Sequence, residues 1–228
     1  LGDIAGTAIV GFGTGAKRPT FTFTTAAAAT FAVSVDNVSI TNCVFLTNFL
    51  GITAAITVTG KWCTIEHCYF YDTSTILNFL NCVNCSGAAN TADGLSFNHN
   101  WVKNLGVTSN NATVLTANDI DRMTFCHNNM DWAIQNDIAS GIIVTAGVLT
   151  RLDCGHNKLY RPNTSTTGGS LISVGGTTST GWVYDNKIQT LDASADVVFT
   201  TTVGLGAFEN FVTGVVGASG FIIPTRDT

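Results

Sequence analysis

Four histidines are the residues whose spacing first suggests chemistry. They are His67, His99, His127 and His156, and each stands one residue before a cysteine or an asparagine, at intervals of 32, 28 and 29 residues. If these positions stack in successive turns of a repeat, neighbouring imidazoles lie about 5 Å apart and could share a metal ion. The favoured interpretation is a stack of flat rings outside a turn, at positions tolerant of positive φ, where histidine is enriched. No carboxylate or thiolate is interleaved to complete a ligand set, so we expect neither a metal nor another cofactor.

A group of carboxylates and guanidinium groups is the second candidate for chemistry. Its members are Asp93, Asp121, Asp153, Arg122 and Arg151. Outward carboxylates on neighbouring strands could bind Ca²⁺ or act as a paired acid and base on a polysaccharide. We favour the alternative that these aspartates stand at turn entrances and form ion pairs with arginines of neighbouring turns. The only two glutamates of the chain are far apart, which argues against a glutamate pair.

Apolar and aromatic residues form a third group, at positions expected to point outward. Val44, Leu46, Tyr69, Tyr71 and Trp101 fall on the two outward offsets that follow the recurring Cys/Asn position. A contiguous apolar patch on a polar surface usually marks a contact surface. We expect a contact between subunits. A sugar-stacking platform and cover by the chain between 68 and 100 are the alternatives.

A short repeat must position all three groups. The pattern apolar-x-apolar-x-x-(Asn or Cys)-x-apolar occurs seven times, and its sixth copy is imperfect because it opens with glycine. The Asn/Cys position is occupied in order by Cys43, Cys68, Asn100, Asn128, Asn157, Asn186 and Asn210. Stacked asparagine amides can donate and accept hydrogen bonds along the axis of a repeat. We therefore predict a structural ladder at a turn between strands.

Short runs of β-branched and apolar residues lie between the copies of this pattern, and no segment keeps a helical period for three turns. Each repeat thus supplies about three short strands, which must stack on neighbouring turns to bury their inward side chains. The sequence predicts an all-β fold, a right-handed parallel β-helix with residues 1–228 as one domain, about eight or nine turns and about 40 Å long. Strand alternation predicts that Ile65 and Phe125 point inward and that Thr64 and Thr124 point outward.

The composition narrows the function classes. The chain has 228 residues, of which 45% are hydrophobic and 11% charged, and its net charge is −5. High apolar content with low charge excludes disorder. The acidic balance and ten scattered cations argue against nucleic-acid binding, and the lack of a long apolar run argues against a membrane partner. The seven cysteines, an odd number, are interpreted mainly as reduced, small hydrophobic residues.

The repeat, with asparagine at an inter-strand turn, resembles the right-handed parallel β-helix superfamily of pectate lyases, polygalacturonases and phage tailspikes. The segments 6–15 (GTAIVGFGTG), 18–23 (RPTFTF) and 35–40 (VDNVSI) are similar to β-helix segments of phage virion proteins. This resemblance implies a place on the surface of a virion, homotrimers, contacts with other virion proteins and a host glycan as a further partner. No catalytic signature of the superfamily matches residue by residue, so no catalytic residue is carried over.

Together these observations predict a non-enzymatic structural or adhesive component of a phage virion, such as a head decoration, fibre or spike. The alternative is a polysaccharide lyase or glycoside hydrolase that uses the Asp93, Asp121 and Asp153 region. The two readings differ in whether those aspartates open on a groove or sit in ion pairs.

Overall fold

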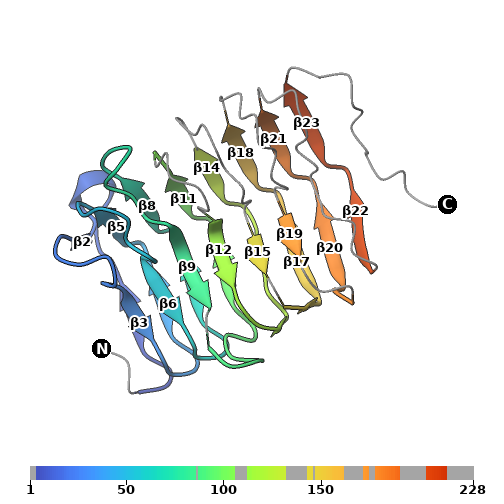
Figure 1. Cartoon of the computed structure of the whole chain (residues 1–228), viewed down its shortest axis with the longest axis horizontal. Coiled ribbons are helices and arrows are strands. Elements are labelled where there is room, and N and C mark those ends of the chain that lie inside the picture. Colours follow the sequence, from blue (N-terminus) through green and yellow to red (C-terminus); the bar gives the residue numbers. More distant parts are fainter. Residues whose placement is uncertain are drawn as a thin grey trace.

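The computed structural model is a parallel β-helix, as the repeat predicts. Apart from one short 3₁₀ turn, η1 (Gly15–Lys17), the regular structure of the described residues consists of strands in parallel sheets. Successive strands of each sheet follow one another along the solenoid axis (Figure 1). The structure describes residues 4–85, 87–105, 112–131, 143–145, 147–161, 172–174, 178–190 and 204–214.

Three sheets run along the solenoid. The first sheet contains β1 (Ala8–Val10), β4 (Ser39–Thr41), β7 (Thr64–Glu66) and β10 (Ser96–Asn98). Bridges through Thr124 continue it to β17 (Leu152–Gly155), β20 (Gly181–Tyr184) and β22 (Leu205–Phe208). The second sheet contains β2 (Thr20–Phe23), β5 (Val44–Thr47), β8 (Tyr69–Asp72), β11 (Trp101–Lys103), β14 (Asn129–Asp131), β18 (Lys158–Arg161), β21 (Lys187–Thr190) and β23 (Phe211–Gly214).

The third sheet closes each turn. It contains β3 (Phe31–Val33), β6 (Ile56–Val58), β9 (Asn81–Cys85), β12 (Ala112–Thr116), β15 (Ile143–Thr145) and β19 (Ile172–Val174). A short pair, β13 (Ile120–Asp121) and β16 (Leu149–Thr150), lies ahead of the first sheet. The turn count differs slightly from the eight or nine expected. The second sheet has eight strands, but within the described residues about five turns hold a named strand of all three sheets.

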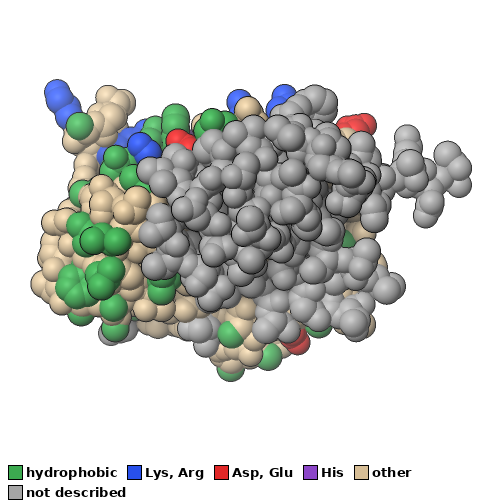
Figure 2. All heavy atoms as spheres, turned by 45° about the horizontal axis from the view of Figure 1, so that its top comes forward, with side chains coloured by type: hydrophobic (Ala, Val, Ile, Leu, Met, Phe, Trp, Pro, Cys, Tyr) green, Lys and Arg blue, Asp and Glu red, His purple; other side chains and the backbone are tan. Residues whose placement is uncertain are grey.

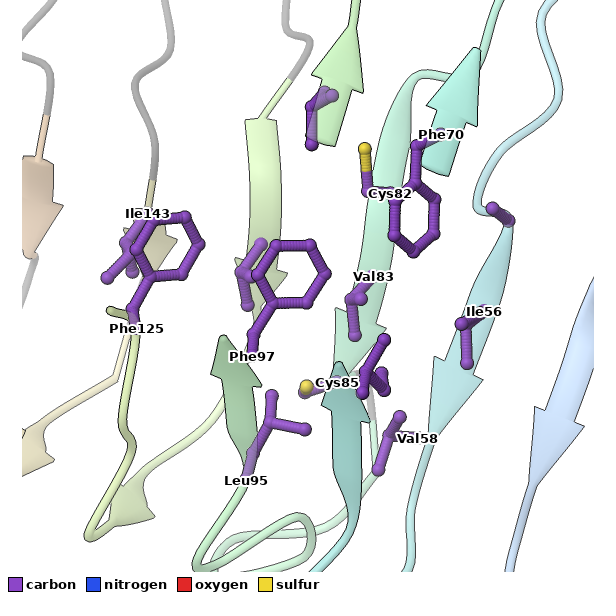
Figure 3. Packing of buried hydrophobic residues seen from close by; sticks show 14 of the residues in the cluster. Ile56, Val58, Phe70, Cys82, Val83, Cys85, Leu95, Phe97, Phe125 and Ile143 are labelled. Atoms are coloured by element: carbon purple, nitrogen blue, oxygen red, sulfur yellow. The ribbon is translucent and has the colours of Figure 1, made fainter. Parts of the chain in front are cut away.

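Stacked aromatic rings form the centre of the core. The inward side chains Phe21, Phe45, Phe70, Phe97 and Phe125 follow one another with ring centroids 5.0 to 5.6 Å apart. Figure 3 shows the last three of these rings in adjacent turns, with aliphatic side chains of the third sheet beside them. Rings in parallel neighbouring strands meet at the strand spacing, so identical offsets in the repeat become contacts in the core.

The register agrees with the predicted alternation. Ile65 and Phe125 are buried, with 1% and 0% of their surface exposed, whereas Thr64 and Thr124 are half-buried on the outer side. Thr64 pairs with Ser96, and Thr124 bridges Ser96 and Asp153, so these outward positions share one column.

Two left-handed bends flank the strands of the first sheet. The bend before the second sheet has φ between 44° and 58° at every turn from the second to the eighth, and its residues are Asn42, His67, His99, His127, His156, Asp185 and Glu209. All four histidines therefore occupy a backbone conformation that L-residues rarely adopt and that His, Asn and Asp tolerate best. The other bend precedes the first sheet and includes Asn37, Trp62, Arg122 and Arg151.

The cysteines behave as core residues. All seven are buried and none is in a disulfide. Burial raises the pKa of the Cys68 and Cys85 thiols to about 12, so they remain neutral at physiological pH. Cys82 and Cys85 both lie on β9 inside the solenoid. This position agrees with the interpretation of the cysteines as reduced, small hydrophobic residues.

Candidate functional site

The asparagine column is a continuous hydrogen-bonded ladder. The Asn128 side chain accepts the backbone N–H of Asn100 at 2.9 Å and donates to the carbonyl of Phe97 at 2.8 Å, both in the preceding turn. It also donates to the side-chain oxygen of Asn157 in the next turn at 3.0 Å. Asn157 and Asn186 repeat these contacts, and Asn210 donates to the carbonyl of Val183.

At this bend, hydrogen bonds to the asparagine side chains take the place of the backbone hydrogen bonds that pair neighbouring strands elsewhere. Asn100, Asn128, Asn157 and Asn186 are at most 3% exposed, so water does not compete for their amides. Cys43 and Cys68 occupy the first two positions, and the backbone N–H of Cys68 donates to the side chain of Asn100. Every buried donor satisfied in this way avoids a penalty of about 1–3 kcal/mol. This geometry is the one expected of a structural column.

The histidine column lies one residue earlier and faces solvent. Adjacent ring centroids are 5.0 Å apart for His67 and His99, and 4.7 Å apart for both His99–His127 and His127–His156. The interplanar angles are 1° to 14°, and all four residues are exposed. Nδ1 of His156 lies 2.6 Å from a carboxylate oxygen of Asp185, the next residue of the column.

The stack does not have the form of a metal site. Among the residues that the structure describes, no group of three or more His, Cys, Asp or Glu side chains is arranged to hold a metal ion. Nitrogen lone pairs lie in the plane of each imidazole, so parallel rings direct them side by side rather than toward one point. Ring stacking by itself therefore explains why the histidines share an offset.

The expected apolar patch is present, and cations cover part of it. Tyr69 and Trp101 are 36% and 42% exposed, and their rings stack at 5.6 Å. Val44, Leu46 and Tyr71 are half-buried in the same two outward columns of the second sheet. The patch is therefore less apolar than the sequence suggests.

Two cations provide this cover. The Arg18 guanidinium lies 4.4 Å from the centre of the Tyr69 ring, and the Lys103 ammonium lies 5.1 Å from that of Tyr71. Both distances are within the range of a cation–π interaction. Arg18 also donates from Nη1 to the carbonyl of His67 at 3.1 Å, which ties the segment after η1 to the histidine column.

A pocket of about 260 Å³ lies between the histidine column and the Tyr69–Trp101 pair. Its lining consists of Arg18, the Tyr69–Trp101 pair, three histidines of the column and two asparagines. The three histidines are His67, His99 and His127. None of the described residues that line it is acidic, although the chain has fifteen Asp and Glu residues.

The cations are less scattered than expected. Lys158 and Lys187 continue the outward column that holds Val44, Tyr69 and Trp101. Lys103 stands in the second outward column of the same sheet, where Asp131 is the single acidic position of the described register. The Lys and Arg side chains visible in Figure 2 gather along the upper edge of the molecule. Lys158 and Lys187 thus stand next to each other in one outward column of the second sheet.

Asp121, of the predicted group of carboxylates and guanidinium groups, forms ion pairs with arginines. Asp121 receives two hydrogen bonds from the Arg151 guanidinium, with Nε at 2.8 Å, and one from the Thr150 hydroxyl at 2.7 Å. Arg122 lies 3.6 Å from the same carboxylate. The hydrogen bond from Arg151 lowers the pKa of Asp121, although burial opposes this shift.

The other two aspartates have separate partners. Asp93 pairs with Lys61 at 3.3 Å and accepts the backbone N–H of Asp121. Asp153 projects from the first sheet, and burial together with a hydrogen bond to its carboxylate raises the pKa of Tyr184 to about 12. The grouping of five therefore divides into an ion-paired bend and an unrelated contact of Asp153.

Sequence reasoning missed a second aromatic cluster at β20 and β22. Tyr184 and Phe208 stack at 5.2 Å, and Trp182, which is 59% exposed, contacts Phe208 edge to face at 5.8 Å. The Tyr184 ring lies over Gly155 and the Trp182 ring over Gly206, where a Cβ would meet ring atoms at 2.5 Å and 2.3 Å. The pairing of each aromatic with a glycine in the neighbouring turn was the signal in the sequence.

Comparisons with known proteins identify no relative of this chain. No protein-family model, no curated protein and no solved structure matches it. Within the described ranges, no helix is both long enough and apolar enough to cross a membrane. The structure therefore supports the parallel β-helix, and the comparisons assign no family to it.

Proposed function

We propose that the protein is a non-enzymatic structural or adhesive solenoid that serves as a head decoration, fibre or spike component of a phage virion. The observation that supports this proposal is the outward face of the second sheet, where exposed aromatic rings and cations line up over successive turns. A stiff parallel stack holds these side chains at the strand spacing of about 4.8 Å. Such a face suits rigid presentation of a binding surface.

The state of the carboxylates favours this role over a lyase or hydrolase. A general acid needs a raised pKa near the working pH, whereas the pKa of Asp121 is lowered by Arg151. Asp93 is held by Lys61 and by a backbone N–H, so it is not poised as a base. An acid–base pair built from these residues would first have to break its ion pairs.

Product assays separate the two functions. We expect no reducing ends and no unsaturated uronate when the protein is incubated with neutral and acidic polysaccharides. Cleavage that disappears in Asp121→Asn or in Asp153→Asn would overturn the proposal in favour of the enzyme. An antibody raised against the chain should label purified phage particles, and failure to label them would contradict the virion assignment.

Self-association is the expected mode of assembly, with a homotrimer implied by the tailspike resemblance. Tyr71→Glu combined with Trp101→Glu should dissociate the assembly and leave the fold intact, because both side chains lie on the outer surface of the second sheet. Sedimentation measures the mass, and circular dichroism checks the fold. Thr64→Glu with Ser96→Glu, on the outer side of the first sheet, is the matched control and should leave the mass unchanged. A monomeric wild type would refute the oligomer.

A further inference from the structure

We propose that the pocket between the histidine column and the Tyr69–Trp101 pair binds one oxyanion group, a sulfate or carboxylate, of an acidic saccharide, and binds it more tightly at acid pH. This inference rests on the proposed adhesive function, to which it adds a ligand class. It stands on the composition of the pocket, its size and the orientation of its rings.

The first argument is the chemistry of the lining. Arg18 supplies a permanent positive charge, and no ion pair neutralises it among the described residues. Its Nε is enclosed and makes no hydrogen bond in the described part of the chain. Three imidazoles and the Asn129 amide add further N–H donors. Donors without a facing carboxylate match an oxyanion, because charge-assisted hydrogen bonds to guanidinium and imidazolium groups are the strong ones.

The second argument concerns size and ring orientation. A pocket of about 260 Å³ lies below the usual range of about 300–1,000 Å³ for drug-sized ligands, so it suits one small group rather than a whole chain. The Tyr69 ring stacks on Trp101, and the Arg18 guanidinium also lies over the Tyr69 ring. A sugar ring would need an exposed aromatic face, which Tyr69 does not offer because Trp101 and Arg18 already lie over it. The anionic substituent of a saccharide therefore fits this pocket better than its ring does.

The third argument is the response of the stack to protons. Burial, together with repulsion from His99 and His156, lowers the pKa of the His127 imidazole. The other groups facing the column are Arg18 above His67, and Asp185 and Tyr184 beside His156. The Asp153 carboxylate acts on His127 in the opposite direction, toward protonation.

An oxyanion in the pocket, beside the edges of these rings, offsets the repulsion that opposes their protonation. By reciprocity, the protonation of the rings and the binding of the anion strengthen each other. Sulfate stays a dianion across this pH range, so any pH dependence of its binding reports on the protein.

Calorimetric titration with sodium sulfate, at constant ionic strength, tests the site. We expect an affinity about tenfold higher at about pH 5.5 than at about pH 7.5, across the range in which histidine titrates. A sulfated disaccharide should bind more tightly than inorganic sulfate, and the unsulfated disaccharide should not compete. Equal affinity for sulfate at the two pH values would overturn the inference.

NMR of the histidine side chains locates the bound ion. Sulfate should shift the resonances of His67, His99 and His127, which line the pocket, and leave His156, which is held by Asp185, almost unchanged. Equal shifts of all four histidines would indicate screening by salt and would contradict a site.

Variants separate the pocket from general charge. Arg18→Gln and His99→Asn should each weaken sulfate binding about tenfold, which corresponds to about 1.4 kcal/mol. Asparagine is a suitable replacement because Asn42 already occupies this column, with φ of 58°. Lys187→Gln removes one exposed charge of the same sheet outside the pocket and should have no effect. Equal loss in all three variants would contradict a localised site.

The outcomes of these experiments also show separately whether the saccharide assignment, the anion site or the non-enzymatic role fails. If inorganic sulfate binds as tightly as the sulfated disaccharide, or if a single-stranded oligonucleotide binds more tightly, the saccharide assignment fails. If sulfate does not bind at all while the protein still assembles and cleaves nothing, this inference fails and the structural role stands. If the protein cleaves the saccharide, the non-enzymatic role fails and the anion site stands.

Discussion

Two columns of polar side chains run side by side along this solenoid, and they differ in what their hydrogen bonds reach. The asparagines from Asn100 to Asn186 are buried and donate and accept within the ladder. The histidines from His67 to His156 stand one residue earlier, at nearly the same spacing, and face solvent. One bend of the backbone therefore separates donors that hold the turns together from imidazoles that face solvent.

The largest expected effect tests the division between buried and exposed columns on the first sheet. Ile65→Asp should prevent folding or cost more than about 4 kcal/mol, because it places an unpaired charge in the core. Thr64→Asp, one residue away and half-buried on the outer side, should cost less than about 1 kcal/mol. Urea unfolding followed by circular dichroism measures both. Similar losses in the two variants would mean that the register is wrong.

The next effect concerns the ladder itself. Asn128→Ala should lower the free energy of unfolding by about 2–4 kcal/mol, since it removes three hydrogen bonds and leaves the N–H of Asn100 buried without an acceptor. Asn129→Ala is the matched control, because Asn129 points outward from β14 and should cost less than about 0.5 kcal/mol. The urea midpoint of unfolding distinguishes the two variants. Equal midpoints would mean that the ladder hydrogen bonds do not contribute to the stability of the fold.

A smaller effect is expected at the ion-paired bend. Asp121→Asn should cost about 1 kcal/mol or less, because Arg151 and Arg122 are half or more exposed and surface ion pairs contribute little. The folded pKa of Asp121 is lowered, so its contribution is present above the unfolded value of about 3.9 and is lost as the pH falls through the folded value. Comparing wild type and variant between pH 7 and pH 2 measures it. A difference that grows toward acid would have the wrong sign.

The smallest effect belongs to the exposed column. The folded pKa of His127 is lowered, so the unfolded chain binds protons first as the pH falls below about 6.5. Its contribution is present above that value and is lost as the pH falls through the folded one. His127→Asn should remove this loss, which we expect to be below about 1 kcal/mol. Thermal unfolding at pH 7.5 and pH 5 without sulfate measures the difference, and a variant that loses as much stability as the wild type would contradict the repulsion.

The repeat allowed much of this arrangement to be predicted, because one offset in the sequence becomes one column in space. The partners of Ser39, Thr64 and Ser96, and the positions of the four histidines, follow from counting residues. The Tyr69–Trp101 contact follows in the same way. These features depend only on the strand spacing and on the alternation of side chains.

Contacts between residues that have no fixed offset from the repeated pattern could not be predicted by counting residues. Arg18 reaches Tyr69 and His67 from the segment after η1, which has no fixed offset from the pattern. The Trp62 ring lies over Gly94, which has no Cβ to block it, and it contacts the Arg122 guanidinium. Counting residues does not show that a ring from a neighbouring turn occupies the space beside a glycine. The cations were interpreted as scattered because net charge averages over faces that the register separates, although Lys158 and Lys187 share one outward offset. Asp153 was grouped with Asp121 although the two lie on different strands: Asp121 ends β13 beside Arg122 and Arg151, whereas Asp153 projects from β17 and contacts Tyr184.

The seven buried thiols can serve as probes of local opening along the solenoid. They are spread along the axis from Cys43 on the second turn to Cys154 on the sixth, and each is enclosed by its neighbours. A thiol reagent can modify a cysteine only while the surrounding turn is open, so the rate of modification at each position reports the opening of that turn. In a stack where every turn contacts only the next ones, opening can proceed from either end. The order in which the cysteines react, read by mass spectrometry of peptides, would therefore tell from which end the rod unwinds.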